Sequence, residues 1–231
     1  MNAAPAAPAK DARALGLLQL RSDPQFPRIE PGRRYALVEA ALADGRLLAV
    51  EVRADLGPDP AFIASSCDVP VIDSESEAGF GTTVVFAEYA TRPPSITLYG
   101  PAIRRLDARI VRENAVRLGI TGTRTIFLAH ELYHHFDCTR SEPIGRRHRV
   151  KIFSLGSWIW TSGLTSLAEI AAGAFAQELL GLSFHPKLLD FLSVQTLNHG
   201  GYFTLREGIR VLKGYSTLRE GIRGSRSKGL K

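Results

Sequence analysis

The order of apolar and polar residues predicts an irregular N-terminus followed by a strand-rich segment. Residues 1–12 are rich in Ala and Pro, which predicts a disordered leader. Apolar residues at 35–42 and 47–52 flank Asp44-Gly45, a pair typical of a tight turn between two strands. The alanines of 35–42 leave a helix open as an alternative for that half. We therefore expect residues 13–80 to form a β-rich segment or a small lobe.

The middle of the chain alternates between irregular, strand and helix patterns. Residues 53–79 are rich in Asp, Pro, Ser and Glu, which predicts an irregular connection. β-Branched and aromatic residues predict strands at 83–89 and 95–99. Apolar residues spaced three or four apart predict amphipathic helices at 102–118 and at about 124–137.

The segment after residue 138 starts polar and then becomes strongly apolar. Residues 139–151 carry several cations and predict an exposed loop, with a short strand at 150–155. Trp158 and Trp160 are expected to lead into a helix at 164–182. That helix is nearly free of charge, so it should be buried on most of its sides.

Together these patterns predict an α+β fold with a helical C-terminal half. A last helix is expected at 188–197, so that residues 81–200 form the main domain. Residues 201–231 form a basic tail in which the sequence of 201–210 recurs at 214–223. Two short copies are too few for a repeat fold, so we interpret them as a tandem duplication in a dispensable tail.

Composition indicates an ordinary globular protein. Of the 231 residues, 45% are hydrophobic and 23% are charged. The apolar runs are too short to span a bilayer, and the N-terminus lacks the pattern of a signal peptide. Two cysteines, Cys67 and Cys138, do not make a disulfide framework, so a reducing cytoplasm is the expected location.

The net charge of +6 is concentrated at the C-terminus. Residues 204–231 contain eight Lys or Arg and only two Glu, which leaves the preceding body neutral. A neutral body argues against a nucleic-acid-binding fold. Nucleic acid is therefore expected to bind weakly through the tail, if at all, and no membrane partner is expected.

The most informative motif is His130-Glu131-Leu132-Tyr133-His134 within the predicted 124–137 helix. Residues four apart lie on one face of a helix, so both imidazoles can hold one metal ion. Glu131 lies beside the first imidazole and is placed to act as a general base on water. The alternative is a pair of histidines on a solvated helix, which the apolar lead-in argues against.

A catalytic zinc ion needs a third protein ligand, and Glu169 is the best candidate. The same helix face carries Ala172, Gly173 and Ala176, whose small side chains permit close approach to the motif helix. A charge on so apolar a helix also calls for a partner. The alternative is a capping box, Ser166-x-x-Glu169, in which the glutamate serves only the helix start.

Other residues remain open as the third ligand. Asp137 is better cast as a carboxylate that orients an imidazole N–H. His135 faces away from His134 around the helix, so the two cannot easily share an ion. The remaining alternatives are His148, Glu178, His185 and, less favoured, Cys138.

The two motifs together resemble those of the ImmA/IrrE-type metallopeptidases, small bacterial and phage proteins of the zincin class. The resemblance rests on His130-Glu131-x-x-His134 and on Glu169-x-x-Ala172-x-x-Phe175-Ala176 some 35 residues later, and covers roughly residues 80–185. It implies a zincin-like fold, in which a small β-sheet packs on the active-site helix of residues 124–137. It also implies Zn²⁺ bound by His130, His134 and Glu169, and Glu131 as catalytic base. Tyr133 and His135 depart from the residues that the family often shows there.

The resemblance also implies a regulatory role, because such proteins often cleave or relieve a transcriptional repressor. The expected substrate is therefore a protein or peptide, with a repressor as the candidate. A non-catalytic zinc-binding module that acts by protein–protein binding is the alternative, as is a ferrous site with the same ligands. Hydrolysis would also need an oxyanion donor, for which the candidates are Tyr99, His185, His199 and Tyr202.

Overall fold

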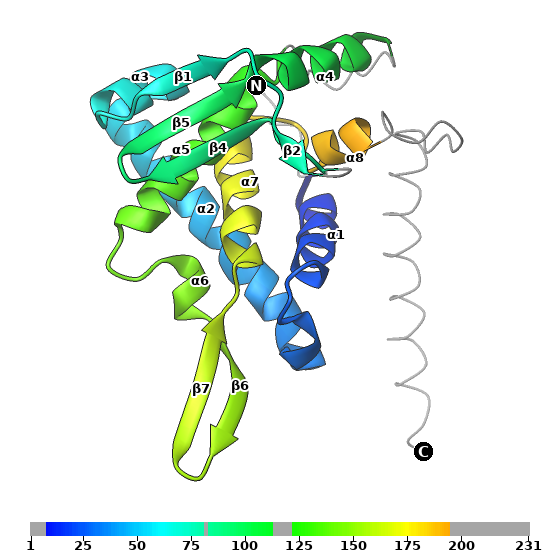
Figure 1. Cartoon of the computed structure of the whole chain (residues 1–231), viewed down its shortest axis with the longest axis vertical. Helices are drawn as coiled ribbons and strands as arrows, with labels where there is room; N and C mark the ends of the chain where they lie inside the picture. Colours follow the sequence, from blue (N-terminus) through cyan, green and yellow to red (C-terminus); the bar gives the residue numbers. More distant parts are fainter. Residues whose placement is uncertain (1–7, 81–82, 113–121, 195–231) are drawn as a thin grey trace, which may run out of the picture.

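The helix that carries the two motif histidines, α5 (Arg124–Thr139), lies between a small sheet and a second buried helix, α7 (Ser166–Leu180) (Figure 1). The computed structural model describes residues 8–80, 83–112 and 122–194. Within them the chain is α+β, as the sequence predicts. The expected disordered leader is helical from Pro8 onward, and the remaining leader residues and the duplicated tail lie outside the described residues.

The N-terminal segment is mostly helical where a β-rich segment was expected, and the alternative of a helix at 35–42 is confirmed. Helix α1 (Pro8–Arg21) and the short 3₁₀ turns η1 (Phe26–Arg28) and η2 (Pro31–Arg33) precede helix α2 (Arg34–Leu56). Helix α2 runs without a break through Asp44-Gly45, where two strands and a turn were expected.

The reason for this error is that Asp44 and Gly45 serve tertiary contacts instead of a turn. A Cβ atom on Gly45 would lie 2.0 Å from the carbonyl oxygen of Ala171, so only glycine lets α2 and α7 approach this closely. Asp44 accepts hydrogen bonds from Tyr133, Arg140 and Arg147. Packing thus outweighs the local preference of the pair for a turn.

The predicted irregular connection at 53–79 contains regular structure. Helix α3 (Pro60–Ser66) begins where the Asp59 carboxylate accepts the Ala61 N–H, a normal N-cap. Two strands follow, β1 (Val71–Ser74) and β2 (Gly79–Phe80).

The small sheet that covers α5 has the strand order β1-β5-β4. Strand β5 (Pro94–Tyr99) is central, pairs parallel with β1 and antiparallel with β4 (Ala87–Thr91), and buries Ile96 and Leu98. The strand expected at 83–89 is therefore divided, because β3 (Thr83–Val84) pairs with β2 in a separate hairpin. The strand expected at 95–99 is confirmed.

The helices around this sheet follow the apolar pattern. Helix α4 (Gly100–Arg112) buries Ala102, Ile103, Leu106 and Ile110, and the rest of the predicted 102–118 helix lies outside the described residues. Helix α7 is buried along most of its length, as expected, and ends at Gly181 in the left-handed conformation. Helix α8 (Leu188–Val194) closes the described chain.

Between α5 and α7 the chain forms a projecting hairpin, which the sequence predicts only in part. The expected loop contains the short helix α6 (Ile144–Arg147), and the expected strand is present as β6 (Arg149–Leu155). Trp158 and Trp160 lie in an antiparallel strand, β7 (Trp158–Gly163), which leads directly into helix α7 as expected. Figure 1 shows that this hairpin extends away from the sheet, at the far end of the molecule.

Candidate metal centre

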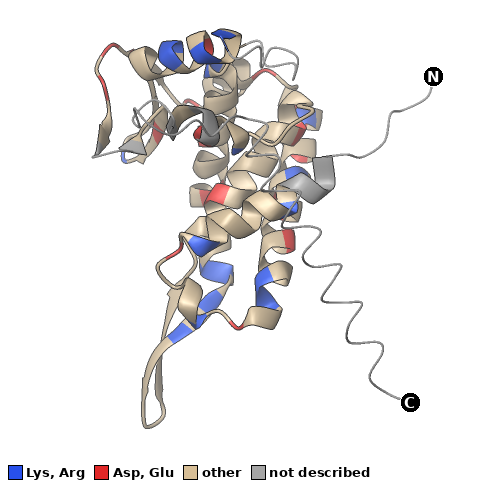
Figure 2. Cartoon of the chain, turned by 90° about the vertical axis from the view of Figure 1, so that its right-hand side faces the viewer, with Lys and Arg blue, Asp and Glu red and all other residues tan. Residues whose placement is uncertain are grey.

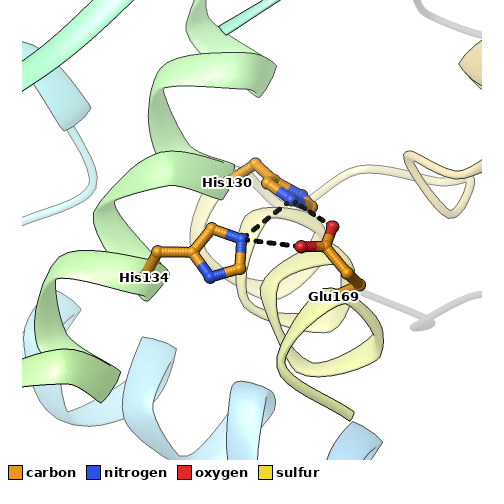
Figure 3. Close-up of side chains that lie close together, drawn as sticks. All are labelled: His130, His134 and Glu169. Carbon is orange, nitrogen blue, oxygen red and sulfur yellow. Dashed lines mark hydrogen bonds and ion pairs between the residues drawn. The ribbon is translucent and has the colours of Figure 1, made fainter. Parts of the chain in front are cut away.

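His130, His134 and Glu169 converge on one point between α5 and α7 (Figure 3). The Nε2 atoms of the two imidazoles are 3.3 Å apart. One carboxylate oxygen of Glu169 is 3.3 Å from Nε2 of His130, and the other is 3.3 Å from Nε2 of His134. The structure thus brings together the residues that the sequence pattern selects.

These spacings fit the ligand set of a zinc ion. Ligands about 2.0–2.1 Å from a tetrahedral centre lie about 3.3–3.4 Å from one another. Two imidazole nitrogens and one carboxylate oxygen are also a donor set that zinc takes at catalytic sites, with a fourth position left for water. The residues present therefore fit such an ion.

Local structure explains how the three side chains meet. His130 and His134 are one turn apart on α5, so their side chains project from the same face. Glu169 lies in the first turn of α7, and its carboxylate turns to the imidazoles. The capping-box alternative is wrong, because the N–H of Ser166 at this helix start is bound by Oδ2 of Asp23 at 3.0 Å.

The electrostatics of the cluster favour a cation. Burial alone would raise the pKa of Glu169, but hydrogen bonds and charge from the two imidazoles outweigh it and hold that pKa far below the ordinary value. Burial alone would lower the pKa of His130, but the Glu169 carboxylate outweighs it and raises that pKa. The carboxylate is thus an anion that faces two nitrogen ligands.

Glu131 is buried beside this cluster and faces a cavity. The cavity has a volume of about 220 Å³, and its lining includes His130, Glu131, Glu169 and residues 84–87. Burial raises the pKa of Glu131, while the charges of His130 and His134 and a backbone hydrogen bond from Tyr89 on β4 work in the opposite direction. A carboxylate with this environment is suited to hold and release a proton.

His185 lines the same cavity and carries an unused hydrogen-bond donor. Its Nδ1 accepts the backbone N–H of Lys187 at 3.2 Å, which places the ring proton on Nε2. His185 is only 4% exposed, and its Nε2 has no hydrogen-bond partner among the residues that the structure describes. Its imidazole packs over Gly173, where a Cβ atom would lie 2.6 Å from Cε1. Burial lowers the pKa of His185 to about 3, so the ring is neutral.

The other candidates of the sequence analysis lie elsewhere. The expected role of Asp137 is wrong, because its Oδ1 accepts the Ile144 N–H at 2.9 Å and no imidazole N–H. His135 pairs with the Tyr89 hydroxyl. Among the described residues, the ligand cluster includes none of His148, Glu178, His185 and Cys138.

The structure also reduces the number of candidates for the hydrogen-bond donor to the oxyanion. The Tyr99 hydroxyl donates to Glu88 at 2.6 Å and is therefore occupied. His199 and Tyr202 lie outside the described residues. His185 is the remaining candidate in the cavity, and the sequence gives no signal for its unpaired nitrogen because that depends on the fold.

Two acidic residues that support the site are absent from the sequence-based prediction. Asp23 binds the backbone at the start of α7, 143 positions further along the chain. Asp44 binds the side chains of Tyr133, Arg140 and Arg147. Each contact joins segments far apart in sequence, so residue spacing gives no sign of it.

Comparisons with known proteins assign no family. No protein-family model, no curated protein and no solved structure matches the chain. Within the part of the chain that the structure describes, no helix is both long and apolar enough to cross a membrane.

Proposed function

We propose that the protein is a zinc-dependent metallopeptidase that hydrolyses a peptide bond in a protein substrate. The observation that carries the proposal is the equal 3.3 Å spacing of the His130, His134 and Glu169 ligand atoms beside a cavity that Glu131 also lines. When bound, Zn²⁺ supplies a Lewis acid that polarises a carbonyl group and lowers the pKa of water.

Glu131 moves the proton in this proposal. Its buried carboxylate accepts a proton from the attacking water and later delivers that proton to the nitrogen of the departing amine. Water adds to the carbonyl carbon, the C–N bond breaks, and the products are a carboxylic acid and an amine. Glu131 lines the same cavity as His130 and Glu169, which places its carboxylate beside the groups that would hold the ion.

His185 provides the donor for the oxygen on which negative charge develops. Its Nε2–H is buried in the cavity wall and has no other partner in the described part of the chain. A preorganised donor of this kind stabilises the transition state without the cost of reorienting water. Because the ring is neutral, it adds no positive charge that would repel a metal ion in the cavity.

The sheet offers a route for an extended peptide. Strand β4 is at the end of the β1-β5-β4 sheet, and residues 84–87 beside it form part of the cavity wall. A peptide can add to such an edge through backbone hydrogen bonds, which bring its amides alongside the metal centre. This arrangement supports a protein or peptide substrate over a small molecule.

The finer assignment to the ImmA/IrrE type is part of the proposal. It rests on the two motifs and on their convergence in space. By that resemblance the substrate is a transcriptional repressor encoded on a separate chain.

The test compares the wild type with Glu131→Gln. Zinc content is measured by atomic emission, and cleavage of a proteome-derived peptide library is read by mass spectrometry. We expect about one zinc per chain in both proteins and cleavage at least 10²-fold slower in the variant. Glu178→Gln on the same helix as Glu169 is the matched control and should retain activity.

Two outcomes would contradict the proposal. Equal cleavage by wild type and Glu131→Gln would show that Glu131 is not the catalytic base. One zinc per chain without any cleavage would favour the alternative, a non-catalytic module that binds a partner protein.

A further inference from the structure

The distal part of the β6–β7 hairpin is unusually apolar for an exposed segment. Its large apolar side chains Phe153, Leu155, Trp158, Ile159 and Trp160 are between 47% and 74% exposed. Isolated exposed apolar residues are normal, but a contiguous group of five indicates an interaction surface. This group lies at the far end of the hairpin, away from the metal centre (Figure 1).

The strand register divides these side chains between two faces. Leu155 pairs with Trp158 and Phe153 pairs with Trp160, so these four share one face. The Phe153 and Trp160 rings stack with centroids 5.8 Å apart. Ile159 pairs with Ser154 and projects from the opposite face, where it is 62% exposed. A protein partner that bound the aromatic face in a groove would leave Ile159, on the opposite face, exposed to water. An environment that surrounds the hairpin would cover both faces.

The base of the hairpin is basic. The sequence contains no Asp or Glu between Glu142 and Glu169. Arg146, Arg149 and Lys151 are exposed near the start of the hairpin. Figure 2 shows Lys and Arg at the base of the hairpin and none along its distal arm.

We propose that this hairpin inserts into the surface of an anionic lipid bilayer. The apolar tip and the basic base are in the order that a bilayer requires, with hydrocarbon deepest and charged headgroups outside. Leu155 is four positions from Lys151, which at about 3.3 Å per residue is about 13 Å. The tip can therefore reach the depth of about 5–10 Å that interfacial segments occupy while Lys151 stays among the headgroups. Tryptophan is enriched at that depth, and exposed cations are attracted to anionic lipids.

This inference does not depend on the metal centre, and it differs from the sequence-based expectation of no membrane partner. In this proposal the β6–β7 hairpin alone holds the protein on the membrane surface. The hairpin therefore provides attachment, and the metal centre remains facing the water.

The chain supplies its own probe for the test. Trp158 and Trp160 are its only tryptophans, so intrinsic tryptophan emission reports on the hairpin alone. The full chain is titrated with phosphatidylcholine vesicles that contain phosphatidylglycerol, and with phosphatidylcholine vesicles alone. We expect the red emission of exposed indoles in solution, a blue shift with the anionic vesicles, and quenching by brominated acyl chains. The shift should weaken at high salt.

Variants test the apolar and the basic parts separately. Ile159→Ser keeps both tryptophans and should weaken vesicle binding about tenfold, because it removes one inserting side chain. Lys151→Glu should weaken binding to anionic vesicles several-fold and leave binding to neutral vesicles unchanged. Phe62→Ser on α3 is the matched control, since Phe62 is 57% exposed elsewhere, and should bind as the wild type does.

Three results would overturn the proposal. Vesicle co-sedimentation without a change in tryptophan emission would assign the binding to the basic tail. Blue emission in the free protein that depends on protein concentration would indicate that the hairpin joins two copies of this chain. An unchanged emission and no co-sedimentation at low salt would exclude membrane attachment.

Discussion

The phenolic hydroxyl of Tyr133 donates a hydrogen bond to Oδ2 of Asp44 at 2.7 Å. Tyr133 is fully buried and directly precedes His134, so this contact joins α2 to the part of α5 that carries the histidines. Arg140 and Arg147 complete the cluster, and the Asp44 side chain is only 12% exposed. We infer that this cluster fixes α5 against α2.

Removal of the Asp44 charge should therefore destabilise the fold. We expect Asp44→Asn to lower the free energy of unfolding by about 1.5–3 kcal/mol, and Tyr133→Phe to lower it by about 1 kcal/mol. Because the two groups share a hydrogen bond, the double variant should lose less than the sum of the single losses. Urea denaturation followed by circular dichroism measures all three, and strict additivity would contradict the coupling.

The same carboxylate should give stability a defined pH dependence. Burial would raise the pKa of Asp44, but hydrogen bonds from Arg147, Tyr133 and Arg140 outweigh it and lower that pKa below 3.8. The unfolded state then takes up the proton first, so the stabilisation is present above about pH 4 and is lost as the pH falls toward the folded value. The stability gap between wild type and Asp44→Asn should shrink over that window. A difference in stability that does not change with pH would show that the Asp44 carboxylate does not cause the pH dependence.

The sequence predicts the cluster of His130, His134 and Glu169 better than the fold around it. The positions of His130 and His134 follow from helix periodicity alone, and Glu169 stands out because it is a charge within an apolar helix. Each of these features can be recognised within one short segment of the sequence. The orientation of His185 is different, because its unpaired nitrogen results from a backbone contact within its own loop and from packing on Gly173.

The errors share a physical cause. Asp44-Gly45 has a strong local preference for a turn, but the pair instead provides a charged cluster and a close helix contact. The strand expected at 83–89 is divided, because β3 pairs with β2 and leaves β4 to pair with β5. The local preference of a segment predicts its secondary structure poorly where a tertiary contact opposes that preference.

The close approach of α2 and α7 should depend on Gly45. Alanine at a helical position normally stabilises by about 1 kcal/mol relative to glycine. Here its Cβ atom would meet the Ala171 carbonyl, a backbone group that cannot rotate away, so we expect Gly45→Ala to destabilise by about 1–3 kcal/mol. Gly32→Ala is the control, because no atom lies within 4 Å of its Cβ position. The difference is measured by thermal unfolding, and equal stability of the two variants would contradict the argument.

Loss of the Glu169 charge should weaken metal binding. We expect Glu169→Gln to bind zinc at least 10²-fold more weakly, since even residues that only orient a ligand account for 10- to 100-fold. Glu178→Gln, on the same helix but outside the cluster, should bind as the wild type does. Competition with a chromophoric chelator gives the affinities. Removal of zinc with EDTA should also lower the melting temperature of the wild type more than that of Glu169→Gln.

His185 should contribute to catalysis and not to metal binding. Leucine at this position removes the Nε2–H donor but retains an apolar side chain in the buried site, so kcat should fall about 10²- to 10³-fold with little change in KM or zinc content. Gly173→Ala should give a smaller loss in kcat by the same route, because its Cβ atom displaces the imidazole. His148→Gln, which lies outside the cavity, is the control. A parallel loss of zinc and activity in His185→Leu would instead make His185 a structural support of the ligands, and an unchanged kcat would show that the oxyanion donor is another group.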